Sequence, residues 1–137
     1  MSELEHKPVL LEVDGLRKAY GERVVLQEIS LTVAPHDVVC LIGASGSGKS
    51  TLLRCLNLLE DIQDGVIRFD GREISDPRVD PRSVRRDVGM VFQAYNLFPH
   101  LSVLDNCTLA QSLVHRVSKA EARSRAVELL ERFGWRT

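Results

Sequence analysis

The sequence lacks the features of a membrane-spanning or secreted chain. No stretch approaches the roughly 18 uncharged apolar residues that are needed to cross a bilayer. The first seven residues, Met-Ser-Glu-Leu-Glu-His-Lys, include acidic side chains and no apolar run, unlike a secretory signal. A net charge of −1 over 137 residues gives no electrostatic reason to expect nucleic acid or an anionic membrane as a partner. We therefore expect a soluble, cytoplasmic protein that does not bind nucleic acid.

Cysteine and histidine are too scattered to indicate a metal site. The cysteines show no CxxC spacing and lie among apolar neighbours, so we expect small buried hydrophobic residues in a reducing compartment. The histidines form no pair at metal-binding spacing. The residues concerned are Cys40, Cys55, Cys107, His6, His36, His100 and His115.

The apolar pattern predicts short strands in the first half of the chain. Alternating or β-branched runs indicate strands at residues 9–13, 24–26 and 29–33, with a turn at 20–23. An Asp-Gly turn at 70–71 predicts a hairpin between residues 65–69 and 72–74. The continuous apolar run 38–42 is typical of a strand buried on both faces in a parallel sheet, and residues 88–92 are expected to form another apolar strand.

Helical signals follow these strands. Residues 50–59 place Leu52, Leu53, Leu56 and Leu59 at helical spacing. Residues 75–86 hold two prolines and many charges, and are expected to form a surface loop or a short exposed helix. Two further helices are expected at about 103–114 and 119–133, capped by Ser102 with Asp105 and by Ser118 with Glu121.

Residues 43–51 form a candidate phosphate-binding loop. They read Gly-Ala-Ser-Gly-Ser-Gly-Lys-Ser-Thr and satisfy the motif G-x-x-x-x-G-K-[ST] in full, between a predicted buried strand and a predicted helix. Glycines let the backbone turn tightly and approach phosphate groups, and backbone amides at a helix N-terminus favour an anion. Lys49 can reach the β- and γ-phosphates, Ser50 can ligate Mg²⁺, and Thr51 can bond the α-phosphate. The expected phosphate-binding residues are Gly43, Ser45, Gly46, Ser47, Gly48, Lys49, Ser50 and Thr51.

Three further features narrow the class of nucleotide-binding protein. Tyr20 lies 23 positions before Gly43, and Gln93 directly follows the apolar run 88–92. Residues 91–106 read Val-Phe-Gln-Ala-Tyr-Asn-Leu-Phe-Pro-His-Leu-Ser-Val-Leu-Asp-Asn. With the loop, these features resemble the ATP-binding subunit of an ABC transporter, and the long segment is similar to that of polar amino acid importers.

The resemblance implies roles for particular residues. Tyr20 would stack on adenine, although a turn tyrosine packing on a hairpin is the plainer alternative. Gln93 would reach Mg²⁺ and the attacking water, although a solvated glutamine at a strand end is the alternative. The catalytic candidates are therefore Lys49 and Gln93, and the candidate metal ligands are Ser50 and Gln93. An apolar cluster would receive a coupling helix of the membrane subunit, unless it is local core; its members are Leu97, Phe98 and Leu101.

The resemblance also implies a fold and a set of partners. The expected fold class is α/β: an incomplete P-loop NTPase (RecA-like) core with an N-terminal antiparallel β subdomain, at about residues 8–93, and the start of a helical subdomain at about 94–137. The implied cofactors are ATP and Mg²⁺. The implied partners are transmembrane permease subunits and a second copy arranged head to tail, at the inner face of the plasma membrane, where ATP hydrolysis would drive import of an amino acid.

Several family elements are missing from this sequence. It contains no Leu-Ser-Gly-Gly-Gln signature, no apolar strand ending in Asp-Glu and no switch histidine after one. We therefore expect an N-terminal fragment that binds nucleotide weakly and lacks turnover alone. Three departures from the family pattern, at His36-Asp37, Ala44 and Ala94, remove no phosphate-contacting group. A non-catalytic nucleotide-binding fragment, or another P-loop NTPase or kinase, stays open as an alternative.

Overall fold

The computed structural model describes residues 9–135 and divides the chain into two compact units. The division falls after Gly89, whereas we placed the boundary near residue 93. Each unit has its own packing and is described by itself.

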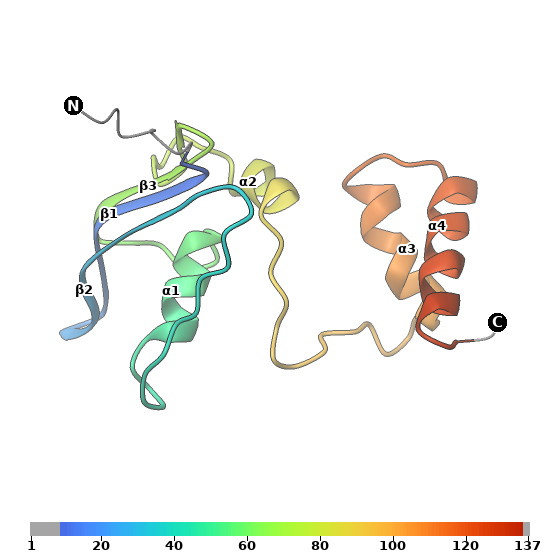
Figure 1. Ribbon diagram of the computed structural model, residues 1–137, viewed down its shortest axis with the longest axis horizontal. Helices are drawn as coiled ribbons and strands as arrows, with labels where there is room; N and C mark the ends of the chain where they lie inside the picture. The colour runs from blue at the N-terminus through green and yellow to red at the C-terminus, as the bar shows by residue number, and fades with distance from the viewer. Residues whose placement is uncertain (1–8, 136–137) are drawn as a thin grey trace, which may run out of the picture. The chain divides into compact units, whose positions relative to one another are not determined.

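The N-terminal unit is built on one antiparallel sheet of four strands (Figure 1). The strands are β1 (Leu11–Tyr20), β2 (Arg23–Val33), β3 (Asp64–Phe69) and β4 (Arg72–Glu73), in the order β2-β1-β3-β4. Both predicted turns are present, at 21–22 and 70–71. The two short strands expected at 24–26 and 29–33 form the single strand β2.

An irregularity in β1 decides which of its side chains are buried. The pairing with β2 shifts between Val13 and Leu16, around Gly15, which has φ +58°. Strict alternation would point residues 13, 15 and 17 to one face. The shift instead buries Val13, Leu16 and Lys18 together, with Leu16 fully inaccessible to solvent.

Helix α1 (Lys49–Leu56) packs on this sheet through Leu52 and Cys55. It ends earlier than the predicted residue 59, because Leu58 takes a positive φ of +52° and the amide of Leu59 bonds back to the carbonyl of Arg54. Leu53 lies within α1 on the face away from the buried Leu52 and Cys55, and it is exposed. Fully burying an aliphatic side chain contributes about 1.5–3 kcal/mol, and the core that fixes α1 against the sheet consists of Val13, Leu16, Leu26, Leu52, Cys55, Ile67, Ile74 and Val84.

The charged segment 75–86 contains a short helix. Helix α2 (Pro81–Asp87) starts after Asp80, whose carboxylate accepts a hydrogen bond from the amide of Arg82 at 3.0 Å. Proline at the first helical position suits this start. Val84 anchors the helix in the core at 3% exposure, so α2 is not wholly a surface element.

Two of the expected apolar strands are absent from the described residues. Residues 38–42 and 88–92 adopt no regular structure. Val38 and Ile42 are 91% and 96% exposed, and Val91 is 99% exposed. A continuous apolar run becomes a buried strand only when neighbouring strands and helices cover it, and no strand between residues 9 and 135 pairs with either segment.

The C-terminal unit holds a pair of helices that pack on each other, α3 (Val103–Leu113) and α4 (Lys119–Arg132) (Figure 1). Both predicted caps are confirmed: Ser102 Oγ accepts from the amide of Asp105 at 3.1 Å, and Ser118 Oγ accepts from the amide of Glu121 at 3.2 Å. Ala122 and Ala126 are the buried residues of α4. Within residues 9–135, no helix is long and apolar enough to cross a membrane.

The cysteines differ in environment. Cys55 is buried as expected, and burial raises the pKa of its thiol to about 11. Cys40 and Cys107 are exposed, so the expectation of burial was wrong for both. Cys40 belongs to the uncovered segment 38–42, and α3, which carries Cys107, buries no residue. The part of the chain that the structure describes has no cluster of His, Cys, Asp and Glu able to hold a metal ion.

Candidate functional site

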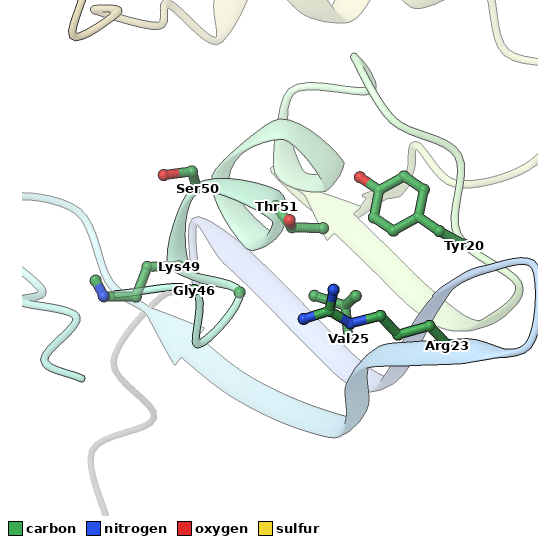
Figure 2. A pocket seen from close by; sticks show the side chains of 8 residues that line it. Tyr20, Arg23, Val25, Gly46, Lys49, Ser50 and Thr51 are labelled. Carbon is green, nitrogen blue, oxygen red and sulfur yellow. The ribbon is translucent and has the colours of Figure 1, made fainter. Parts of the chain in front are cut away.

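An open pocket of about 420 Å³ lies in the N-terminal unit between the β1–β2 turn and the start of α1 (Figure 2). Its wall combines an aromatic ring, two cationic side chains and two small hydroxyl side chains with the backbone of the glycine loop. The lining residues are Tyr20, Arg23, Val25, Gly46, Gly48, Lys49, Ser50 and Thr51. Segments about 25 residues apart in sequence therefore form one site.

The turn between β1 and β2 positions one side of the pocket. Tyr20 ends β1, Arg23 begins β2, and the two residues face each other across the last pair of the ladder. The side chain of Tyr20 is 45% exposed. Figure 2 shows Arg23 reaching from β2 between the ring of Tyr20 and the loop. We did not single out Arg23 from the sequence, although the Tyr-Gly-Glu-Arg turn placed it opposite Tyr20.

The glycine loop forms the opposite side. Gly46 and Gly48 have φ of +79° and +90°, which side-chain-bearing residues rarely adopt. A Cβ on Gly48 would lie 2.8 Å from Leu26 Cδ2 and 3.2 Å from the carbonyl oxygen of Val25. Glycine therefore lets the end of the loop press against β2, and this contact fixes where α1 begins.

Lys49 is turned back onto its own loop. Its Nζ donates to the carbonyl oxygens of Gly43 and Ala44, each at 2.8 Å, and to Ser47 Oγ at 3.3 Å. The ammonium is therefore held at the loop by three oxygen acceptors. Phosphate oxygens are stronger acceptors of the same hydrogen bonds, so a phosphate chain could replace them as partners of Lys49.

Ser50 and Thr51 lie in the first turn of α1. The first amides of a helix have no partners within the helix, and the helix dipole makes this end attractive to anions. No acidic side chain lies in the first turn of α1. Both residues line the pocket, and Figure 2 shows the Thr51 side chain on the side of Tyr20 and the Ser50 hydroxyl directed away from the ring. A hydroxyl beside a phosphate site is the ligand that P-loop proteins offer to Mg²⁺.

The structure brings together most, but not all, of the predicted site residues. Tyr20 and five loop residues share the pocket: Gly46, Gly48, Lys49, Ser50 and Thr51. Gly43 and Ser47 act through Lys49. Ser45 is exposed on the loop and does not line the pocket. Gln93 belongs to the C-terminal unit, in the irregular segment before α3, and its side chain is exposed; its role toward a metal stays a prediction.

Behind Tyr20 lies a small polar cluster. Lys18 is 5% exposed, and its Nζ lies 4.8 Å from the centroid of the Tyr20 ring, 3.3 Å from Glu60 Oε2 and 2.6 Å from the carbonyl oxygen of Asp61. Hydrogen bonding by Lys18, and secondly by Tyr20, lowers the pKa of the Glu60 carboxyl. Lys18 does not line the pocket.

These features define a P-loop nucleotide-binding protein. Comparison with known proteins agrees, because a family model described as ABC transporter matches residues 26–137. The amino-acid ABC transporter ATP-binding protein YhdZ of Escherichia coli, described as uncharacterized, is 47% identical over 134 residues, which are 96% of this chain and 53% of that protein. The glutamine transport ATP-binding protein GlnQ of the same organism is 46% identical over 125 residues, covering 91% of this chain and 52% of that one.

Solved structures show the same relationship. The ATP-binding cassette MJ0796, in a dimeric post-hydrolysis state bound to ADP and Pi, superposes with a TM-score of 0.77 at 30% identity, over 88% of this chain and 56% of that chain. This chain belongs to the ABC transporter family, and its fold is that of an incomplete ABC ATPase core. The chain spans about half the length of the curated relatives it matches.

Proposed function

We propose that this chain binds the nucleotide in an ATP-binding subunit that couples ATP binding and hydrolysis to amino-acid import. The observation that carries the proposal is the shared pocket of Tyr20 and the loop residues 46–51. An aromatic platform at one end and a glycine-rich cradle with a lysine at the other match a nucleotide, which has a flat base and a polyanionic tail.

Within this site each side chain has a separate task. Tyr20 offers its ring to the base. Lys49 exchanges the carbonyl oxygens of Gly43 and Ala44 for phosphate oxygens, and the loop amides and the N-terminus of α1 take up the remaining negative charge. Arg23, between these two ends, adds a positive charge on the side of the ribose and the α-phosphate.

The proposal includes Mg²⁺, for which Ser50 is the candidate ligand in the N-terminal unit and Gln93 the candidate in the C-terminal unit. Ser50 lies in the first turn of α1 and lines the pocket beside the loop, and an amide oxygen at Gln93 could ligate the metal or orient water without adding a charge. The metal would neutralise charge on the phosphates and polarise the bond that is broken. Gln93 also lies next to the segment that we assign to the membrane partner, so its position could report on that partner.

The proposed substrate class is amino acids, and the proposed partners are membrane permease subunits. Several of the relatives carry amino-acid transport names. Leu97 and Phe98 are 63% and 50% exposed, as an apolar docking surface requires. A permease partner would place the chain at the inner face of the plasma membrane, and the dimeric cassette structure supports pairing with a second subunit.

Binding of Mg-ATP to the purified 137-residue chain, measured by isothermal titration calorimetry, tests the loop. Lys49→Ala removes the one ammonium among the lining residues that the structure describes. It is expected to weaken ATP binding at least about tenfold, because hydrogen bonds to charged groups contribute about 1.5–3 kcal/mol each. The circular dichroism spectrum should not change, since Lys49 contacts only its own loop.

Lys119→Ala is the matched control, because Lys119 is exposed at the start of α4 and lies outside this pocket. It should bind Mg-ATP like the parent chain. Equal affinity of the Lys49→Ala variant and the parent would overturn the assignment of the loop.

A further inference from the structure

Lys18 is a buried cation that the phosphate site does not use. It is 5% exposed, lies on β1 and does not line the nucleotide pocket. Burying an ammonium is costly unless it is paired and hydrogen-bonded. Its partners all come from the short connection after α1 or from Tyr20, two residues further along β1.

The geometry of these contacts converges on the Tyr20 ring. Lys18 Nζ lies 4.8 Å from the ring centroid, within the range of a cation–π interaction. The same ammonium is held by Glu60 Oε2 at 3.3 Å and by the carbonyl oxygen of Asp61 at 2.6 Å. One face of the ring is therefore engaged by a cation that is itself held in place.

The bulge in β1 makes this arrangement possible. The shift around Gly15 turns Lys18 to the buried face together with Leu16 and Val13. Without the shift, alternation from Val13 would point Lys18 away from the core. The amide of Gly15 is bonded to Ser30 Oγ at 2.9 Å, which helps to hold the irregular strand in place.

We propose that Lys18, braced by Glu60 and the Asp61 carbonyl, is a positioning residue that holds one face of Tyr20 so that the other face receives the base of the nucleotide. A ring held in one orientation loses less conformational entropy when a base stacks on it. The inference rests on the proposed function of Tyr20 and extends it to residues outside the pocket.

The test compares two probes, Mg-ATP and Mg-inorganic triphosphate, by titration calorimetry on the 137-residue chain. Triphosphate uses the loop but has no base. Lys18→Met keeps most of the apolar stem and removes the charge. We expect Lys18→Met to weaken the binding of Mg-ATP about tenfold, because a desolvated cation–π contact and its ordering of the ring are lost. The affinity for Mg-triphosphate should stay within about twofold of the parent value.

A double-mutant cycle separates positioning from general damage. In a Tyr20→Ala background, Lys18→Met should have no further effect on Mg-ATP, because the ring that it positions is gone. Lys18→Arg, which keeps a cation over the ring, should restore most of the affinity. Equal losses for both probes, or an undiminished loss in the Tyr20→Ala background, would show a structural role only and overturn the inference.

Glu60→Gln provides a second route if Lys18→Met fails to fold. Glu60 is at the protein surface, with 26% of its side chain accessible, and the amide keeps its size. We expect a loss of about threefold for Mg-ATP and none for triphosphate. Failure of the proposed function gives a different result, because Tyr20→Ala alone would then leave the affinity for Mg-ATP unchanged. If Tyr20→Ala weakens Mg-ATP binding but Glu60→Gln and Lys18→Met do not, only the positioning role of Lys18 fails.

Discussion

Arg23 brings a second positive charge to the wall of the pocket, together with Lys49. The two cations differ in their surroundings. Lys49 bonds three oxygen atoms of its own loop, while Arg23 projects from the first residue of β2 toward the space between ring and loop (Figure 2). A guanidinium offers five donors in a planar fork and suits both phosphate oxygens and sugar hydroxyls. This position should therefore contribute affinity through charge.

We expect Arg23→Gln to weaken Mg-ATP binding about threefold to tenfold, since a partly exposed charge contributes less than a buried one. The loss should shrink as salt concentration rises, because ions screen the interaction. Calorimetry at low and high ionic strength measures both effects. Arg72→Gln is the control: Arg72 is exposed in β4 and does not line the pocket. Equal affinities of the two variants would contradict the role of Arg23.

At the scale of residues, the glycine loop has a sequence motif, whereas the residues that support the pocket around it have none. The glycine spacing carries its own geometry, so Gly46, Gly48 and Lys49 could be assigned before any fold was known. Lys18 and Arg23 could not be assigned in that way. Their positions depend on an irregular pairing in β1 and on which residues meet across a turn, and both are tertiary facts with no motif of their own.

At the scale of elements, the backbones of β1 and β3 approach closely at Gly65, in β3. Gly65 has φ +91°, and a Cβ there would lie 2.6 Å from the backbone nitrogen and Cα of Leu16. No side-chain movement relieves a clash with backbone atoms. Leu16 is fully buried at this point, so the contact couples β3 to the bulged part of β1 that also orients Lys18.

Gly65→Ala should therefore destabilise the N-terminal unit by at least about 3 kcal/mol, the sum of an unfavourable φ and a steric clash. Gly71→Ala is the matched control, because Gly71 has φ +73° but no atom within 4 Å of an added Cβ. It should cost only about 1 kcal/mol. Urea unfolding followed by circular dichroism measures both, and equal costs would show that the close approach is unimportant.

Elements with a local signal were predicted closely, and those that need distant partners were not. The caps at Ser102 and Ser118 and the hairpin turn at 70–71 are determined by neighbouring residues, and all three are present. The strands expected at 38–42 and 88–92 depend on a sheet that would cover them. No strand pairs with them in the described chain. An apolar sequence alone therefore does not form the strand that it predicts.

For the whole molecule, the most consequential surface is the segment 38–42 that leads into the loop. Val38 and Ile42 are almost fully exposed, Cys40 is exposed as well, and across residues 9–135 the backbone of this segment has no hydrogen-bonded strand neighbour. A β-branched, uncharged edge of this kind pairs readily with another chain. It connects directly to Gly43, so any partner strand would also touch the base of the nucleotide site.

We therefore expect the 137-residue chain to bind a hydrophobic dye and to self-associate, because an exposed apolar run lowers its free energy by burial. The double variant Val38→Ser, Ile42→Ser should bind much less dye and sediment as a smaller species at the same concentration. Leu113→Ser, on α3 in the C-terminal unit, where the residue is 72% exposed, is the control and should change neither. If the double variant associates like the parent chain, then another surface drives the association, and segment 38–42 must already be satisfied in solution by contacts within the chain.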